Sequence, residues 1–251
     1  MVHNPKFSII TVCKNANTSI GVTVDSVTGQ TYRDFEYLLI DGASTDGTTE
    51  IVRERTAGLA ASIISEPDAG IYDAMNKGLR LARGEWVYFL NAKDCLYDAR
   101  VLERIADRVQ ELPKVELIYG DVIYYNGEQR RLVRFNWLNR WNLRFEHLCH
   151  QAVFARRSLF EHIGNFDLRY KINADYDWLL RVFCSNRSTA HIDFPVAFYD
   201  SDGVSARQHK QLIAERKVVR AKYLPKIIGG PLQWGYRGYR KGRRMSGFLE
   251  R

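Results

Sequence analysis

The sequence predicts an α/β fold in which a mostly parallel central sheet is flanked by helices and followed by a helical, basic C-terminal extension. Three observations indicate this fold. Apolar, β-branched runs alternate with amphipathic segments of helix length over roughly the first third of the chain. Turns rich in glycine and aspartate separate these segments. Apolar residues make up 45% of the 251 residues, which is typical of a globular protein that buries a core.

Four strands and three helices are expected at the start of the chain. Each strand is a short apolar run bounded by polar residues, and the four runs lie at 7–13, 35–40, 61–65 and 86–90. The helices between them are expected from 18 or 19 to 27, from 45 or 46 to 55, and over 71–83. This βαβαβαβ order favours parallel strands joined by right-handed crossovers, so the carboxyl ends of the four strands should share one edge.

The remainder of the chain is less regular. Pro113 ends a helix expected at 99–112, and Asn126-Gly127 marks a hairpin turn between strands at 115–125 and 129–135. Further on we expect helices at 158–163, 175–184 and 207–224, and a strand-like run at 190–199. The segment 136–150 has no clear period, and it suits a binding loop as well as a surface loop packed by its tryptophans.

The net charge and the spacing of the cysteines limit the classes of function that are open to this chain. The formal net charge of +8 favours nucleic acid, phosphorylated ligands or an anionic membrane as partners. From Lys226 onward, basic and aromatic residues suit either an anionic membrane surface or a solvated tail. The four cysteines form no CxxC pair and no zinc spacing, and no apolar run reaches the ~18 residues of a membrane span. With no signal-peptide pattern at the start, we expect a cytoplasmic protein, at the inner face of the membrane if the tail binds there.

Polar residues follow all four predicted strands: Asn15, Asp41, Asp68 and the segment 91–94. Polar residues end most strands, but four acid- or amide-rich ends on one edge favour a ligand site. There is no GxGxxG after the first strand and no GxxxxGK[ST], which argues against a classical dinucleotide site and a P-loop ATPase. Carboxylates on such an edge can bind a base or ribose, or hold a divalent cation that bridges phosphates.

Three motifs carry a family resemblance. They are DGASTDGT from Asp41, EPDAGIYDAMNKG from Glu66 and GEWVYFLNAKD from Gly84. In this order they resemble the family-2 glycosyltransferases of GT-A, Rossmann-like fold, in particular the bacterial branch that builds exopolysaccharide, colanic-acid-like and O-antigen repeats. The resemblance covers about residues 6–202. It divides the chain into a transferase domain (1–205, with a nucleotide half at about 6–112 and an acceptor half at about 113–205) and an extension (206–251).

The resemblance implies an inverting transferase. It would move a sugar from a nucleotide-diphosphate donor, UDP-linked rather than GDP-linked, to a hydroxyl of a glycan or lipid-linked acceptor in cell-surface polysaccharide synthesis. Asp175 would be the general base, and Asp94 would hold Mn²⁺ or Mg²⁺. Asp41 would contact the nucleoside base, within a donor set of Thr11, Asn15, Asp41, Ser44, Asp68, Lys77 and Asn91. The acceptor or phosphate region would include His150, Gln151 and Asp177.

Two departures from the family pattern keep other interpretations open. Lys93 stands where an acid is usual, and like charges ~4 Å apart cost about 4 kcal/mol at an effective dielectric near 20. An extended backbone would turn Lys93 away from Asp94, whereas any other backbone could bring Lys93 to the diphosphate and weaken metal dependence. Ala174 replaces the usual Glu beside Asp175, which without the resemblance would be interpreted as a helix-start acid.

A noncatalytic protein that binds nucleotide sugars or polyanions is the alternative function, with Lys93 and Ala174 as marks of lost catalysis. Nucleic-acid binding through the tail is a third hypothesis. It is disfavoured because the tail contains no recognition module and the acids at the sheet edge would repel phosphates.

Overall fold

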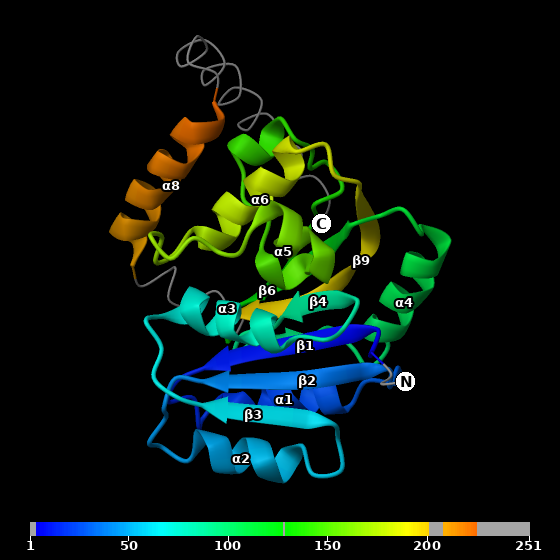
Figure 1. Cartoon of the computed structure of the whole chain (residues 1–251), viewed down its shortest axis with the longest axis vertical. Coiled ribbons are helices and arrows are strands. Elements are labelled where there is room, and N and C mark those ends of the chain that lie inside the picture. Colours follow the sequence, from blue (N-terminus) through cyan, green and yellow to red (C-terminus); the bar gives the residue numbers. More distant parts are fainter. Residues whose placement is uncertain (1–3, 128, 201–207, 225–251) are drawn as a thin grey trace.

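The computed structural model describes residues 4–127, 129–200 and 208–224, and the structural statements below concern these residues. One curled sheet runs through the molecule, with helices packed on both faces (Figure 1). Its strand order is β3-β2-β1-β4-β8-β6-β9-β5, and β7 pairs with β6. The predicted tail from residue 225 onward lies outside the described residues.

The first half of the sheet is parallel, as the sequence predicts. Its strands are β1 (Phe7–Cys13), β2 (Phe35–Asp41), β3 (Ala61–Ser65) and β4 (Trp86–Phe89). β1 pairs with β2 and β4, and β2 pairs with β3. Cys13 lies in register with Asp41, and Asp41 with Ser65, so the carboxyl ends meet at one edge.

Different helices cover the two faces of the sheet. In β1, Phe7 and Ile9 belong to one apolar cluster while Ile10 and Val12 belong to the other, which is the alternation of a strand buried on both sides. The first face is covered by α1 (Ile20–Thr28), α2 (Thr48–Arg55) and α4 (Val101–Glu111). The second face is covered by α3 (Ile71–Leu81), α5 (Arg157–Ile163) and α6 (Ala174–Cys184).

Helix α3 lies unusually close to β1 because of a glycine. A Cβ added at Gly78 would meet the Cγ2 atom of Ile10 at 2.5 Å, so a side chain there would push the helix away from the sheet. The close approach also fixes the position of Tyr72 at the start of α3, which matters for the site described below.

The second half of the sheet contains both parallel and antiparallel pairs, so the α/β sheet as a whole is mixed. β8 (Val153–Arg156) is antiparallel to both β4 and β6 (Leu117–Tyr125), and β9 (Thr189–Asp200) is parallel to β6. The short strands β5 (Cys95–Leu96) and β7 (Arg130–Val133) are antiparallel to β9 and β6. The sequence pattern does not predict β5 or β8 because runs of two and four residues are too short to show a period.

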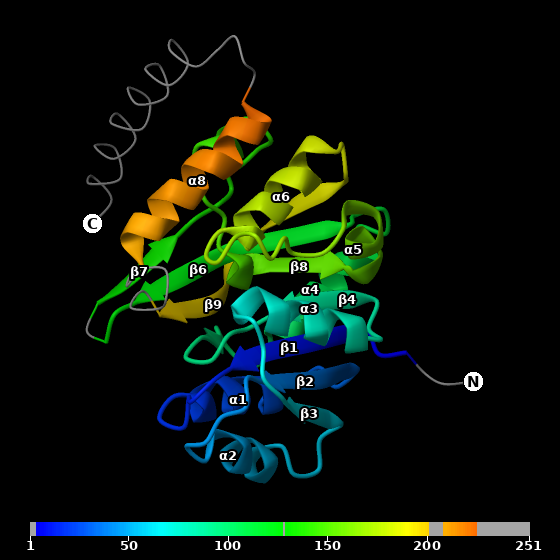
Figure 2. The same ribbon diagram turned by 60° about the vertical axis from the view of Figure 1, so that its left-hand side comes forward.

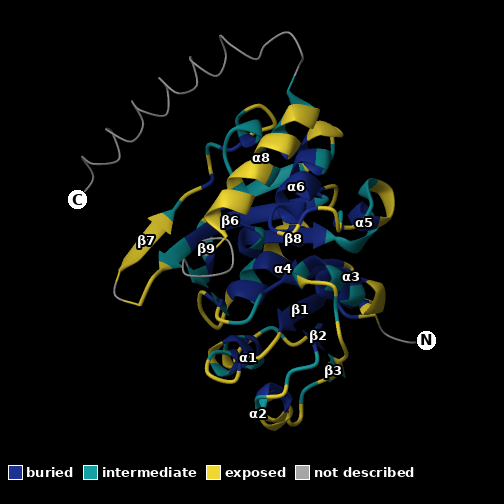
Figure 3. Cartoon of the chain, turned by 90° about the vertical axis from the view of Figure 1, so that its left-hand side faces the viewer, coloured by how far each residue is buried: buried dark blue, intermediate teal, exposed yellow. Residues whose placement is uncertain are grey.

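The irregular segment before β8 contains two 3₁₀ turns, Asn142–Arg144 and His150–Ala152. The last described helix, α8 (His209–Tyr223), lies beside α6 at the end of the molecule opposite α2 (Figures 1 and 2). Figure 3 shows that much of α8 and β7 is exposed, whereas the central strands are buried. No described helix is long and apolar enough to cross a membrane.

Candidate active site

Asp41 organises the carboxyl end of β2. Its side chain is buried, and its carboxylate accepts hydrogen bonds from the Ser44 backbone N–H (2.8 Å), the Ser44 hydroxyl and the Ser65 hydroxyl (2.6 Å). Burial alone would raise the pKa of Asp41, but these hydrogen bonds outweigh it and lower the pKa below its usual value. The ionised carboxylate therefore holds the loop after β2 against the end of β3.

The loops after β1 and β3 converge on the same turn. The Asn15 backbone N–H donates to Ser44 Oγ at 2.7 Å, and Asn15 has a φ of 48°, a left-handed conformation in which asparagine is enriched. A Cβ added at Gly42 would meet Asp68 Oδ2 at 2.5 Å, so only glycine leaves room for that carboxylate. The structure thus gathers four of the predicted donor residues: Asn15, Asp41, Ser44 and Asp68.

Two other predicted donor residues are engaged within the fold. Lys77 Nζ donates to the Pro67 carbonyl at 2.6 Å and lies 3.0 Å from Glu66 Oε1, so it fastens the loop after β3 to α3. Thr11 is fully buried, and its hydroxyl accepts a hydrogen bond from Tyr37 at 3.0 Å. The structure therefore does not bring Thr11 to the surface of the strand edge.

Asp94 is buried in the loop after β4. Its Oδ2 accepts from Gln151 Nε2 at 2.6 Å, and its Oδ1 accepts from the Asp200 backbone N–H at 2.9 Å. Burial raises the pKa of Asp94 to about 7, an effect that these hydrogen bonds only partly offset. Gln151 therefore lies against the predicted metal ligand, close to the donor loops.

The backbone at Lys93 is not extended, since its φ is 83°. Lys93 and Asp94 therefore do not alternate as neighbours in a strand do. The Lys93 side chain is 42% exposed, and its Nζ lies 3.8 Å from Asp200 Oδ2. Because Asp200 also contacts Asp94 through its backbone, the amine is held near this loop by an acid and remains open to solvent.

A hydrogen-bonded chain joins Asp175, His150 and Asn91. Asp175 Oδ2 lies 2.9 Å from His150 Nδ1, and His150 Nε2 lies 3.0 Å from Asn91 Nδ2. Since an ionised carboxylate only accepts, Nδ1 carries the proton, and the neutral imidazole accepts from Asn91 at Nε2. The imidazole is therefore held by a hydrogen bond at each of its two ring nitrogens.

Asp175 is buried and ionised. Its Oδ1 lies 2.8 Å from the Tyr72 hydroxyl and accepts from the Tyr176 backbone N–H at 2.8 Å. Burial alone would raise the pKa of Asp175, but the contacts with His150 and Tyr72 outweigh it and hold the pKa well below its usual value. A cavity of about 20 Å³ beside Asp175 and His150 has room for about one water molecule and not for a sugar ring.

Sequence reasoning misses two residues of this cluster. Tyr72 stands inside the second family motif, yet nothing in the pattern predicts that its hydroxyl reaches a helix that starts at residue 174. His147 Nε2 lies 3.8 Å from Asp175 Oδ2. Burial lowers the pKa of His147 to about 4, so this imidazole is neutral at pH 7. Its spacing of three residues from His150 is the one sequence signal that could have suggested a pair.

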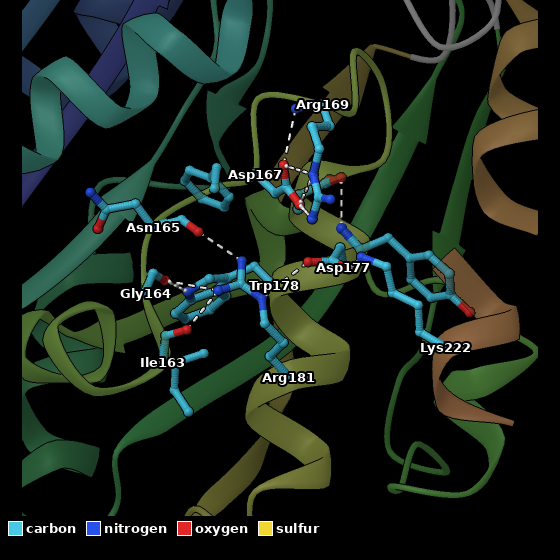
Figure 4. A network of polar contacts seen from close by, with 12 residues as sticks. Ile163, Gly164, Asn165, Asp167, Arg169, Asp177, Trp178, Arg181 and Lys222 are labelled. Carbon is cyan, nitrogen blue, oxygen red and sulfur yellow. Dashed lines mark hydrogen bonds and ion pairs between the residues drawn. The ribbon is translucent and has the colours of Figure 1, made fainter. Parts of the chain in front are cut away.

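Asp177 occupies a different environment from Asp175. Its buried carboxylate accepts from Arg181 Nε and from Lys222 Nζ, both at 3.0 Å, which ties α6 to α8 (Figure 4). Arg181 also donates to the backbone carbonyls of Ile163, at the end of α5, and of Asn165, in the loop that follows. Asp177 therefore anchors two helices, and the described contacts do not link it to His150 or Asn91.

The residues at the end of β4 can contribute oxygen ligands to a divalent cation, although they do not enclose one. No group of three or more His, Cys, Asp or Glu side chains in the described ranges is arranged to hold a metal ion. Each Asp94 oxygen accepts one of the hydrogen bonds given above and keeps a lone pair. The buried Asn91 Oδ1 has no hydrogen-bond partner among the described residues. Such a set fits a cation that takes most of its ligands from a diphosphate, as Mg²⁺ commonly does.

Comparison with known proteins identifies the family. The sequence profile of "Glycosyl transferase family 2" matches residues 8–175. The chain belongs to this family. It is 40% identical over 207 residues to the "PGL/p-HBAD biosynthesis glycosyltransferase" of Mycobacterium tuberculosis H37Ra, covering 79% of this chain and 78% of the relative. It is 27% identical over 219 residues to the "Amylovoran biosynthesis glycosyltransferase AmsB" of Erwinia amylovora, covering 81% and 72%. The protein is thus a glycosyltransferase.

Solved structures confirm the GT-A fold of this family-2 chain. The S. aureus TarS 1-349 structure in complex with UDP superposes with a TM-score of 0.71 at 19% identity, covering 87% of this chain and 65% of that one. The mannosyltransferase PcManGT from Pyrobaculum calidifontis, in complex with GDP-Man and Mn²⁺, superposes with a TM-score of 0.68 at 20% identity, covering 87% and 64%. At these identities the likeness establishes the fold alone.

Proposed function

We propose that this glycosyltransferase is an inverting enzyme that moves a sugar from a nucleotide-diphosphate donor to a hydroxyl of a glycan or lipid-linked acceptor in cell-surface polysaccharide synthesis. The hydrogen-bonded chain from Asp175 through His150 to Asn91 carries this proposal. It joins a base in the acceptor half (about 113–205) to the strand edge of the nucleotide half (about 6–112). A transferase needs this connection, because a base must act where the donor's anomeric carbon lies.

In the proposed reaction the acceptor oxygen attacks the anomeric carbon directly, and the bond from that carbon to the diphosphate breaks. The acceptor proton passes to the Asp175–His150 pair, and the nucleoside diphosphate leaves with the bonding electrons. A single displacement of this kind inverts the anomeric configuration. Nuclear magnetic resonance of the product checks this step, since a retained configuration would contradict it.

On the donor side, we propose that the turn around Asp41, with Asn15, Ser44 and Asp68, receives the nucleoside. Its converging loops and ionised carboxylate support this role. UDP is the first donor nucleotide to test and GDP the second. Relatives of the same fold are known with UDP, with UDP-GlcNAc and with GDP-Man, so the fold admits both bases.

We propose Mn²⁺ or Mg²⁺ as the cofactor, held by Asp94 together with the donor diphosphate. A cation there would neutralise the charge that develops on the leaving diphosphate. Lys93 could supply part of the positive charge of the cation, because its backbone is not extended and its amine is solvent-accessible. Metal dependence is therefore the property that Lys93 should modulate.

Calorimetric titration with UDP and GDP, each with Mn²⁺ and then with EDTA, tests the proposed function. We expect metal-dependent binding of one nucleotide that is lost in Asp94→Ala. Metal-independent binding would assign the diphosphate contact to Lys93. If the folded protein bound neither nucleotide, the donor class would be wrong and the noncatalytic polyanion-binding alternative would gain support.

A cytoplasmic location, at the inner face of the membrane when the acceptor is lipid-linked, follows from the proposed acceptor class. The basic, aromatic segment 226–251 is the part of the chain that would meet an anionic membrane, and it lies outside the described residues. Co-sedimentation of the full chain with anionic vesicles, compared with neutral ones, tests this proposal.

A further inference from the structure

A second and much larger cavity lies away from the donor edge. It is a groove of about 730 Å³ between β6, β7, the segment 135–147 and helix α8. Figure 2 shows these elements side by side on the flank of the molecule that carries α8 and β7. Its volume is in the range of small-molecule binding sites. None of the donor-side residues described above lines it.

The groove is strongly basic. Among the residues that the structure describes, its walls carry four cationic side chains, Arg131, Arg216, Lys217 and Arg220, against one acid, Glu146. Four positive charges and one negative charge give these walls a net charge of +3. His147 adds no charge because its imidazole is neutral at pH 7. Cations gathered on the walls of a concavity focus a positive potential inside it, which favours an anionic ligand.

Arg216 and Arg220 differ in the number of hydrogen bonds that their guanidinium groups make. Arg220 donates to the Tyr176 hydroxyl at 3.2 Å and to the Phe145 carbonyl. The Arg216 Nε is buried without any hydrogen-bond partner, and the described contacts of this side chain are limited to a cation–π approach 5.7 Å from the Tyr176 ring. A buried guanidinium N–H without an acceptor is costly, and binding an anion there would remove that cost.

The groove reaches the proposed catalytic pair. His147 lines the groove, and its Nε2 lies 3.8 Å from Asp175 Oδ2. A molecule anchored in the groove would therefore lie next to His147, one side chain away from Asp175. Four aromatic residues, Tyr124, Phe135, Trp137 and Phe145, also line the groove and add surfaces that suit sugar rings or an apolar chain.

We propose that this groove binds the acceptor through a phosphate or diphosphate group. The inference rests on the proposed function in one respect, because it makes the anion part of the acceptor. The phosphate chemistry could be carried by a lipid diphosphate or by a soluble phosphorylated compound, and the two sources differ in whether an apolar chain adds affinity.

Neighbouring arginines of β7 provide a matched pair of variants. Arg131 lies over the Tyr124 ring in the groove, whereas Arg130 lies over the rings of Tyr125 and Phe198. Successive residues of a strand point to opposite faces, so Arg130→Gln removes the same charge from the other face. Both arginines and Lys217 are exposed, so Arg131→Gln, Lys217→Gln and Arg130→Gln should all fold.

The experiment titrates the full chain and these variants with inorganic pyrophosphate, farnesyl diphosphate and uncharged farnesol. We expect both diphosphates to bind the wild type, with affinity roughly 10-fold weaker in Arg131→Gln and Lys217→Gln and within about twofold of wild type in Arg130→Gln. Tighter binding of farnesyl diphosphate than of pyrophosphate would assign the lipid source. Equal binding would assign a soluble phosphate. Either result supports the groove.

Three results would overturn the proposal: no binding of either diphosphate, unchanged affinity in Arg131→Gln and Lys217→Gln, or binding of farnesol as tight as that of its diphosphate. UDP binding measured on the same samples distinguishes a failure of the groove proposal from a failure of the proposed donor chemistry. Intact UDP binding with a failed groove test would refute only the acceptor site. Groove-dependent diphosphate binding without any nucleotide binding would refute the proposed donor chemistry and keep the groove as an anion site.

Discussion

Asp175→Asn replaces one carboxylate oxygen by an NH₂ group and leaves the volume of the side chain almost unchanged. The amide oxygen of the substituted side chain can still accept from the Tyr176 N–H and face Tyr72, as Asp175 Oδ1 does at 2.8 Å. The new NH₂ group would face His150 Nδ1, which in the wild type donates to Asp175 Oδ2 at 2.9 Å. His150 must then move its proton to Nε2, where the Asn91 NH₂ opposes it. One substitution therefore disturbs both hydrogen bonds of the imidazole.

The expected loss of turnover for Asp175→Asn is roughly 10²–10⁴-fold, the usual contribution of a general base. This corresponds to about 2.7–5.4 kcal/mol of transition-state stabilisation. Two lost hydrogen bonds should also cost about 2 kcal/mol of stability, so the melting temperature should fall by roughly 4–8 °C. Rates must therefore be compared well below the melting temperature of the variant.

The assay is nucleotide release from the sugar donor, combined with calorimetric nucleotide binding on the same preparation. We expect turnover to fall while nucleotide affinity stays within about threefold of wild type. Near wild-type turnover would refute the assignment of the base. A loss of nucleotide binding as large as the loss of turnover would show that Asp175 supports the donor site instead.

His150→Gln decides how the pair works. If Asp175 and His150 act as one unit, His150→Gln should lose about as much turnover as Asp175→Asn, and the double variant should lose little more. If Asp175 takes the proton by itself, His150→Gln should keep most of the activity.

Three further predictions concern the surroundings of the site. Asp177→Asn should lower the melting temperature by roughly 4–8 °C, since it leaves Lys222 without its buried partner at a cost of about 2 kcal/mol of stability. Thermal scans combined with turnover measurements should show near-normal activity per folded molecule. Asp41→Asn should be least stable relative to wild type above about pH 4, because the lowered pKa of Asp41 contributes stability that is lost as pH falls through the folded value. Urea unfolding at about pH 7 and about pH 3 should show the stability difference narrow at the lower pH, and a constant difference would contradict this. Lys93→Gln should make nucleotide binding several-fold more dependent on Mn²⁺ if the amine contacts the diphosphate, and an unchanged ratio of affinities with Mn²⁺ and EDTA would exclude that contact.

Local patterns in the sequence were sufficient for the first half of the sheet. The strands at 7–13 and 61–65 have the predicted bounds, and the helix predicted from residue 71 begins there. Each of these elements is defined by residues close in sequence, namely an apolar run or a helical period next to a turn. Because parallel strands place their carboxyl ends on one edge, the meeting of Asn15, Asp41 and Asp68 could also be predicted.

The tertiary structure alone decided where the proposed base and its partners lie. β8 is antiparallel to β4, so the residues just before β8 sit at the carboxyl end of β4. That arrangement brings His150 to Asn91 and Gln151 to Asp94 across 59 and 57 positions of the chain.

No local period specifies these contacts, because they depend on a four-residue strand whose direction is set by its neighbours on both sides. Local sequence patterns also do not specify the contacts of Tyr72 and Asp177, and they give no reason to assign one of these side chains rather than the other to the site. Packing of α3 and α6 directs Tyr72 to Asp175, while Asp177, two positions along the same helix, faces Lys222 of α8. The sequence thus determined the chemistry that is present, and long-range packing determined which groups share a proton.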